Sequence, residues 1–343
     1  MLNFLYENQP KCENFIPRKL LLDEDKILLF APLLCGKTTL GLNWLKNYRN
    51  SFYLDTDDLR LKLNFAELCE FVEQKNIKAL CLDNITKIPE ILPKCEKILL
   101  ICRQKNLQSP GFKKLNLFGL DFEEFMAFSK NSTKNTLFSH FMSSGNSLPI
   151  NKDENFFRYA IFANISKTAR EILSTKTLYE SSYFNALSVF RELKNNIKIS
   201  KDFFYKEIQK LYDIGIIDFC YNFEQNSRLK KMYFCDFSLR KFFTLNKNPR
   251  KIIENMIFCE LAKSGKNVYF WGEFDFYLPD RKTAVLVLPF LSSELALLKA
   301  KKLLNPRISE IIIISNTEQK THIIENIKLR FMDFTTFAAG YLE

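Results

Sequence analysis

The residues with the clearest chemical potential are Gly36, Lys37 and Thr38, which follow an apolar run at 27–30 and precede a helix-forming run at 39–48. A strand, a loop that ends in Gly-Lys-Thr, and a helix together form an arrangement that cradles phosphate. Backbone N–H groups of such a loop face the anion, the lysine reaches the β- and γ-phosphates, and the threonine hydroxyl binds Mg²⁺. The alternative is a chance Gly-Lys-Thr in a lysine-rich chain, but the flanking strand and helix patterns favour nucleotide binding.

One position departs from the usual motif, because Ala31 stands where G-x-x-x-x-G-K-[ST] has its first glycine. Alanine has a small Cβ, so it is compatible with the loop if that position does not need a positive φ. We therefore expect the loop and the first turn of the helix to bind ATP. The residues expected around its phosphates are Pro32, Leu33, Leu34, Cys35, Gly36, Lys37, Thr38 and Thr39.

Asp83 and Asn84 close the apolar run at 79–83. A carboxylate at the end of such a strand supports Mg²⁺ in nucleotide-hydrolysing P-loop proteins, so we expect Thr38 and Asp83 to hold the metal. The alternative is an ordinary aspartate at a strand end. Asn84 is a candidate catalytic residue, but an asparagine orients a water molecule without being able to take its proton.

The first 120 residues alternate between strand and helix patterns, which argues for a parallel sheet with helices on both faces. The ligand of such a sheet lies beyond the carboxyl ends of the strands, so Lys37, Asp83 and Arg103 can converge there. We expect Arg103 to sense the γ-phosphate. The predicted strands are 27–30, 51–54, 79–83 and 97–102, and the predicted helices are 39–48 and 65–75.

The composition excludes several classes of protein. The chain has 343 residues, of which 47% are hydrophobic, so it can bury large cores in two or three domains. No apolar run is long enough to span a membrane, and the N-terminus does not have the pattern of a signal peptide. The 9 cysteines form no C-x-x-C pair, and only 2 histidines are present, so zinc ribbons and histidine-based sites are not expected. We expect a cytoplasmic protein.

The loop segment 31–40 resembles that of prokaryotic AAA-type P-loop ATPases that carry a winged helix and a C-terminal restriction-endonuclease-like domain of unknown function. Other segments are similar to this family in the same order, and the resemblance extends over residues 18–315. These segments are 52–60, 82–89, 117–125, 211–218, 231–236, 254–255 and 272–276. Each motif outside the loop is short, so the shared order is the specific part of the resemblance.

The resemblance and the element pattern together imply an α/β fold: a P-loop parallel sheet flanked by helices, then a winged helix and a small mixed α/β restriction-endonuclease-like domain. The expected domains are 1–127 (nucleotide binding), 128–175 (helical lid and linker), 176–243 (winged helix) and 244–343 (endonuclease-like). Members of the AAA type carry a glutamate that activates water where this chain has Asn84. We therefore expect ATP hydrolysis to be slow or absent.

The nuclease signature that the resemblance implies is a glutamate on a helix, an aspartate on a strand, and Glu-x-Lys on the next strand. Glu254 and Asp275 match the first two places, but Leu286 and Leu288 stand where the last two are expected. A metal site that lacks a ligand and its lysine is not expected to cut DNA. The following helix offers Glu294 and Lys299 as a less favoured substitute.

Residues 176–251 contain 15 lysines and arginines and 8 aspartates and glutamates, so their net charge is 15 − 8 = +7, out of +11 for the whole chain. A helix, a second helix and a two-stranded ribbon are typical of a winged helix, and its basic residues suit contact with the phosphates of duplex DNA. The alternatives are a protein partner or a solvated helix face. The basic residues in question are Lys201, Lys206, Lys210, Arg228, Lys230 and Lys231.

The sequence thus predicts an ATP-binding protein, with Mg²⁺, that acts as a slow switch. The alternative function is that of a nucleic-acid-binding regulator or scaffold whose P-loop has lost its function, and measured nucleotide affinity separates the two.

Overall fold

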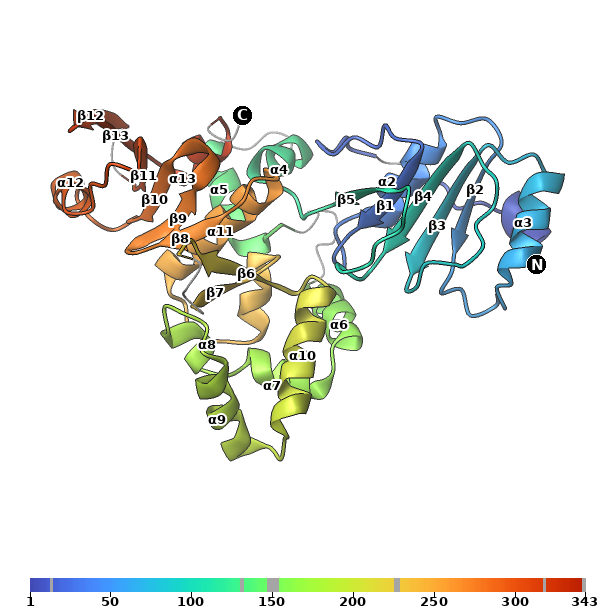
Figure 1. The fold of residues 1–343 in the computed structure, drawn as a ribbon, viewed down its shortest axis with the longest axis horizontal. Coiled ribbons are helices and arrows are strands. Elements are labelled where there is room, and N and C mark those ends of the chain that lie inside the picture. Colours follow the sequence, from blue (N-terminus) through green and yellow to red (C-terminus); the bar gives the residue numbers. More distant parts are fainter. Residues whose placement is uncertain (13–14, 130–132, 147–153, 225–228, 317–318, 341–343) are drawn as a thin grey trace. The chain divides into compact units, whose positions relative to one another are not determined.

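The computed structural model describes residues 1–12, 15–129, 133–146, 154–224, 229–316 and 319–340. The chain divides into two compact units (Figure 1). Unit 1 comprises Met1–Gly119 and Gln209–Ile216, and unit 2 comprises Leu120–Ile208 and Ile217–Glu343. Within the described residues, no helix is long and apolar enough to cross a membrane.

Unit 1 is built on a parallel sheet in the order β2-β3-β4-β1-β5, as the alternating pattern predicts. β1, the strand that leads into the Gly36-Lys37-Thr38 loop, therefore lies between two neighbours, and the carboxyl ends of the strands meet at one edge. The strands are β1 (Lys26–Phe30), β2 (Ser51–Asp55), β3 (Ala79–Ile85), β4 (Lys97–Cys102) and β5 (Lys113–Asn116).

Helices cover both faces of this sheet, because successive side chains of a strand point to opposite faces. In β1, Leu28 packs into the same apolar cluster as α3 (Phe65–Gln74), whereas Leu29 packs into the cluster of α2 (Lys37–Leu45). A Cβ on Gly41 of α2 would lie 2.9 Å from Ile101 Cδ1. The glycine therefore allows α2 to pack close to the sheet.

Unit 1 also contains residues 209–216, which follow in sequence long after the rest of it. They are the last residues of α10 (Lys201–Asp213) and its C-terminal cap, where Gly215 has a φ of 72°. A Cβ on Gly215 would lie 2.8 Å from Pro32 Cγ in the loop between β1 and α2, so glycine fits both the conformation and the space. Asp213 accepts a backbone hydrogen bond of 2.7 Å from Lys105 N.

Unit 2 contains a mixed sheet in the order β12-β13-β11-β10-β9-β8-β6-β7. The pairs β6/β8, β10/β11 and β11/β13 are parallel, and the other pairs are antiparallel. The strands are β6 (Ile217–Asn222), β7 (Lys230–Phe234), β8 (Tyr269–Trp271), β9 (Phe274–Leu278), β10 (Thr283–Val287), β11 (Glu310–Ile314), β12 (Lys320–Ile324) and β13 (Ile327–Met332).

Two helices lie on opposite faces of this sheet. The buried helix α11 (Pro249–Lys263) shares an apolar cluster with Val285 and Val287 of β10, and α12 (Ser293–Lys301) shares another with Leu286 of the same strand. The other helical segments are α1 (Leu2–Glu7), α4 (Phe122–Phe128), α5 (Lys134–Ser144), α6 (Glu154–Asn164), α7 (Lys167–Leu173), α8 (Thr177–Glu180), α9 (Ala186–Asn196), η1 (Phe237–Phe242), η2 (Pro279–Arg281) and α13 (Phe334–Ala338).

The compact units do not coincide with the predicted boundaries at 127, 175 and 243. The two-stranded ribbon of the predicted winged helix continues into the sheet of the predicted endonuclease-like segment, because β6 pairs with β8 through Tyr221 and Asn222. The separation into a winged helix and an endonuclease-like domain therefore stays a prediction. The pattern of residues 181–195 predicts one helix; the structure has α9 (Ala186–Asn196) there, so the helix begins five residues later than expected, and α8 (Thr177–Glu180) ends before residue 181.

Candidate functional site

The loop between β1 and α2 contains two residues with positive φ. Gly36, the N-cap of α2, has a φ of 80°, and Leu34 has a φ of 63°. Glycine adopts this conformation freely, whereas for other residues it costs about 1–2 kcal/mol. Such backbone is concentrated at ligand-binding loops, where it can turn N–H groups toward an anion. Ala31 is buried and does not have a positive φ, so alanine is compatible with its place.

The N-terminus of α2 is suited to an anion. No side chain caps it, and its first turn contains no acidic residue, so no side chain of α2 itself opposes the positive end of the helix dipole. Arg18 donates to the carbonyl of Cys35 at 3.0 Å and to that of Phe118 at 2.8 Å, which ties the loop to the segment after β5. The loop therefore has a fixed shape.

Thr38 and Asp83 come together as the sequence predicts. Thr38 Oγ1 donates to Asp83 Oδ2 at 2.5 Å, and Asp83 is fully buried. The same oxygen accepts from Tyr53 OH at 3.1 Å, and Oδ1 accepts from the backbone N–H of Asn84 at 2.7 Å. Burial, with Asp83 and Asp55 nearby, raises the pKa of Tyr53, so the phenol stays a donor. A hydroxyl and a carboxylate oxygen side by side are the ligands that Mg²⁺ prefers.

Lys37 lies at the same edge of the sheet, with a side chain that is only 11% exposed. Its ammonium nitrogen donates to Asn84 Oδ1 at 2.8 Å and lies 3.9 Å from Asp83 Oδ1. Burial lowers the pKa of Lys37, an effect that Asp83 opposes and Arg103 adds to. A buried ammonium next to an uncapped helix terminus offers an anion both charge and hydrogen bonds.

Asn84 sits in a β-bulge. The register between β3 and β4 shifts between Leu82 and Ile85, and Asn84 has a φ of 64°. Asparagine tolerates this left-handed conformation better than most residues, and a bulge re-aims a side chain. The Asn84 amide accepts from Lys37, and it donates through Nδ2 to Asp55 Oδ1 at 2.7 Å.

Arg103 completes a chain of polar contacts. Its Nε donates to Asn84 Oδ1 at 2.9 Å, and its Nη1 lies 3.1 Å from Asp57 Oδ2. The Asn84 amide therefore links the lysine of the loop to Arg103. The catalytic, nucleotide-binding and metal roles of these residues stay predictions, but the structure brings Lys37, Thr38, Asp83, Asn84 and Arg103 to one place.

The sequence analysis missed three contributors to this site. Tyr53 and Asp55 lie on β2, and the pairing of β2 with β3 places them beside Asp83 and Asn84. Arg18 lies outside regular structure, and no pattern in the sequence marks it.

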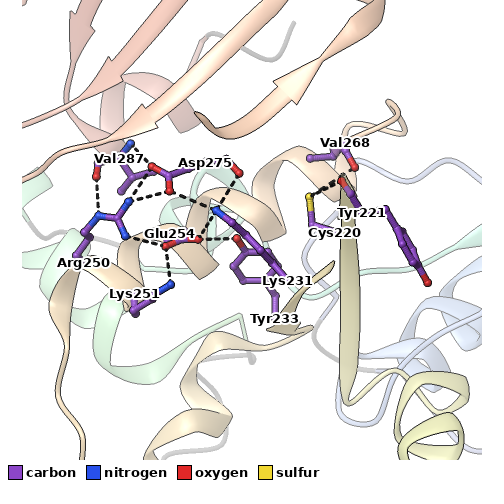
Figure 2. A network of polar contacts seen from close by, with 10 residues as sticks. All are labelled: Cys220, Tyr221, Lys231, Tyr233, Arg250, Lys251, Glu254, Val268, Asp275 and Val287. Atoms are coloured by element: carbon purple, nitrogen blue, oxygen red, sulfur yellow. Dashed lines mark hydrogen bonds and ion pairs between the residues drawn. The ribbon is translucent and has the colours of Figure 1, made fainter. Parts of the chain in front are cut away.

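A second polar cluster lies in unit 2, where Glu254 of α11 and Asp275 of β9 are 0% and 5% exposed (Figure 2). Lys231 of β7 lies on one side of the two carboxylates, 3.1 Å from Glu254 Oε1 and 3.4 Å from Asp275 Oδ1. Arg250 lies on the other side, 3.2 Å from Glu254 Oε2 and 2.8 Å from Asp275 Oδ1. Tyr233 OH donates to Glu254 at 2.7 Å.

These contacts fix the charge state of the cluster. Burial would raise the pKa of Glu254, but Lys231, Lys251 and Arg250, together with Tyr233, outweigh burial and lower it to about 2. Burial likewise would lower the pKa of Lys231, but Glu254 and Asp275 raise it. Cations of the chain thus compensate both carboxylates, and the expected loss of cleavage stays a prediction.

Two details of the sequence analysis need correction. The residues of β10 that pack on the α11 side are Val285 and Val287, not Leu286 and Leu288, because strand side chains alternate between faces. The backbone N–H of Val287 donates to Asp275 at 2.8 Å. Val285 and Val287, on the face that carries the cluster, supply no metal ligand, and the comparison with Glu-x-Lys stays a prediction.

The second correction concerns the basic residues of 176–251. Lys231 is 7% exposed and belongs to the buried cluster, so it does not lie on a surface for DNA. Lys230 is partly buried, with its ammonium 3.6 Å from the ring centroid of Phe219. Arg228 lies outside the described residues. The three lysines of α10, Lys201, Lys206 and Lys210, are exposed.

No protein-family model matches the chain, and no curated protein matches it. A signal transduction ATPase with numerous domains from Pyrococcus horikoshii, which has a tetratricopeptide repeat sensor, is 15% identical at a TM-score of 0.31 and is matched over 74% of this chain and 46% of that chain. A structure of Drosophila ORC bound to DNA is 12% identical at a TM-score of 0.25, over 67% of this chain and 90% of that chain. The chain thus spans less than half of the first of these proteins, and TM-scores this low carry no conclusion about function.

Proposed function

We propose that unit 1 binds ATP with Mg²⁺ and acts as a nucleotide-dependent switch with slow hydrolysis. The observation that carries the proposal is the contact of Thr38 with the buried Asp83, directly beside the Lys37 ammonium and the uncapped N-terminus of α2. These groups offer two oxygen ligands to a cation and a positive cradle to an anion within one site, which is what a nucleotide–metal complex requires.

Each group then has a defined role. The backbone N–H groups of residues 33–39 and the ammonium of Lys37 hold the phosphates, and Thr38 and Asp83 hold Mg²⁺. Bound Mg²⁺ would neutralise charge on the phosphate oxygens. Asn84 orients groups but has no basic atom for a proton, so water activation is weak and turnover slow.

The switch would work through the Asn84 amide. Lys37 donates to Asn84 Oδ1, an acceptor that it shares with Arg103. When phosphate draws the ammonium of Lys37 away, Asn84 keeps only Arg103 on that oxygen, and the chain of contacts to Asp57 is free to rearrange. Occupancy of the loop is thereby communicated to the ends of β2, β3 and β4.

A second candidate function is that of a nucleic-acid-binding regulator whose loop does not bind nucleotide. The exposed lysines of α10 and the balance of +7 in residues 176–251 favour it. The two candidates differ in their nucleotide affinity and are separated by one measurement.

The test is calorimetric titration of the full chain with ATP, ADP and GTP in the presence of Mg²⁺. We expect binding of ATP that Lys37→Ala abolishes, and that Thr38→Val makes less dependent on Mg²⁺. Lys26→Ala is the matched control, because Lys26 is an exposed lysine at the opposite end of β1. The absence of heat at millimolar ATP, or an equal loss in Lys26→Ala, would contradict the proposal.

A further inference from the structure

A small pocket of about 40 Å³ lies beside the buried cluster of unit 2. The segment between α8 and α9 lines it together with β7, Arg240 of η1 and the start of α11. Ser182 and Tyr183, two of its lining residues, are exposed, so the pocket communicates with solvent. It is separate from the nucleotide site, because every residue that lines it belongs to unit 2.

Positive charge predominates around this pocket. Its charged lining residues are Lys231, Arg240, Lys251 and Glu254, a balance of 3 − 1 = +2. The one carboxylate is already satisfied, because Glu254 accepts from Tyr233 and pairs with Lys231, with Lys251 and, on its far side, with Arg250. An anion bound in the pocket would therefore be attracted by the excess of positive charge, because the charge of Glu254 is already balanced by its own partners.

Arg240 is the clearest source of that surplus. Its guanidinium donates to the backbone carbonyl of Asn246 at 3.2 and 3.3 Å and lies 4.8 Å from the ring centroid of Tyr179. Among the residues that the structure describes, no carboxylate pairs with it. Burial lowers the pKa of Arg240, an effect that Tyr179 opposes. Partial burial of a cation costs desolvation free energy, and an anion bound next to the guanidinium would offset that cost.

The volume limits what the anion can be. A pocket of this size accommodates a group of a few heavy atoms, so a compact tetrahedral anion fits it. Guanidinium, ammonium and hydroxyl donors suit a tetrahedral oxyanion. Ser181 and Ser182, which line the pocket, offer such hydroxyls.

We propose that this pocket binds the terminal phosphate group of a phosphomonoester, held by Arg240, Lys251 and the hydroxyls of Ser181 and Ser182. The remainder of the ligand extends into solvent past Ser182 and Tyr183. A small phosphorylated molecule and the 5′-phosphate end of a nucleic acid offer the same group, and the experiment distinguishes them.

The first measurement is calorimetric titration of the full chain with inorganic phosphate, in the wild type and in Lys37→Ala, at ionic strength matched with chloride. We expect both proteins to bind phosphate in this pocket. Arg240→Gln and Lys251→Met should each weaken that binding by about tenfold or more, since each removes a charged donor. Lys247→Ala, at an exposed lysine of the same unit, should leave it unchanged. Circular dichroism and gel filtration verify folding, and Ser181→Ala is the milder variant should the others fold poorly.

The second measurement is competition against inorganic phosphate in the Lys37→Ala protein. Glycerol phosphate and a 5′-phosphorylated single-stranded oligonucleotide are compared with the same oligonucleotide ending in a 5′-hydroxyl. Competition by glycerol phosphate alone assigns a small-molecule ligand, and competition by the phosphorylated oligonucleotide but not its 5′-hydroxyl form assigns a nucleic acid end. Phosphate binding that Arg240→Gln, Lys251→Met and Ser181→Ala leave unchanged, or that neither phosphomonoester displaces, would overturn the proposal.

Discussion

Replacing Lys231 with methionine tests whether the cluster of unit 2 depends on internal cations. The ammonium of Lys231 lies 3.1 Å from Glu254 Oε1 and 3.4 Å from Asp275 Oδ1, and both carboxylates are buried. Removing one partner of a buried pair costs about 3–5 kcal/mol. Arg250 continues to contact both carboxylates, so we expect a loss near the lower limit, about 3 kcal/mol, in the free energy of unfolding at pH 7.

The pH dependence gives an independent value. The pKa of Glu254 is lowered from 4.5 to about 2 in the folded protein. The corresponding stabilisation is fully present above pH 4.5 and is lost as the pH falls toward 2; a shift of this size is linked to roughly 3 kcal/mol. In Lys231→Met the folded protein binds a proton on Glu254 more readily. The difference between wild type and variant should therefore shrink as the pH falls from 7 to 4.

Fluorescence can follow unit 2 alone, because the chain has only 2 tryptophans, Trp44 in unit 1 and Trp271 in unit 2. In a Trp44→Phe background, urea unfolding monitored at Trp271 reports the transition of unit 2. Lys230→Met is the matched control on the same strand; it removes a cation–π contact worth about 0.5–1 kcal/mol. A loss below about 1 kcal/mol for Lys231→Met, or one equal to that of the control, would refute the reasoning.

Three further predictions concern unit 1 and α10. Gly41→Val should destabilise unit 1 by about 1–3 kcal/mol in urea unfolding monitored at Trp44, because a Cβ there would lie 2.9 Å from Ile101 Cδ1. An unchanged unfolding midpoint would show that the neighbouring side chains rearrange to make room for the valine. Asn84→Glu should raise the slow ATP turnover by about 10²-fold or more in a phosphate-release assay, although the φ of 64° at this position costs the glutamate variant some stability. Asn84→Gln should not raise turnover. Equal rates in the two variants would contradict the view that hydrolysis is slow because a general base is absent at position 84. If α10 contacts duplex DNA, Lys206→Ala should remove about one phosphate contact. The log–log slope of DNA affinity against salt concentration should then change by about 0.9, equally on unrelated DNA sequences, and binding that does not depend on salt would exclude contact through phosphates.

Local patterns predicted which residues converge at the candidate site of unit 1, because these residues lie in short segments with clear patterns. Apolar runs mark β1, β3 and β4, and their carboxyl ends carry the polar residues, so a parallel sheet was sufficient to predict that Lys37 and Asp83 converge. The bulge at Asn84 could not be predicted, since it depends on the register between β3 and β4 rather than on residue type.

Unit 2 was harder to predict because its sheet joins strands that are distant in the sequence. The pairing of β6 with β8, which lie on either side of α11 in the sequence, has no local signal. This pairing joins β7 to the sheet that carries Asp275, so Lys231 belongs to the buried cluster instead of a surface for DNA. The strands β12 and β13 and the short helix α13 were not predicted at all. β13 does alternate apolar and polar residues, but the sequence analysis did not use this pattern; in the structure β13 pairs with β11, β12 pairs with β13, and α13 shares the apolar cluster of α11.

The discontinuity of unit 1 has a consequence for how the protein is made. Residues 209–216 are synthesised after the first 89 residues of unit 2, yet Gly215 packs against Pro32 in the loop that carries Lys37. On a ribosome, the sheet of unit 1 can form early, but the surface behind its phosphate loop stays uncovered until the end of α10 emerges. A fragment that ends at Gly119 would keep every residue predicted to touch nucleotide and still lack this support. We therefore expect the proposed nucleotide binding to reach its full affinity only late in synthesis, after residue 216 has left the ribosomal exit tunnel.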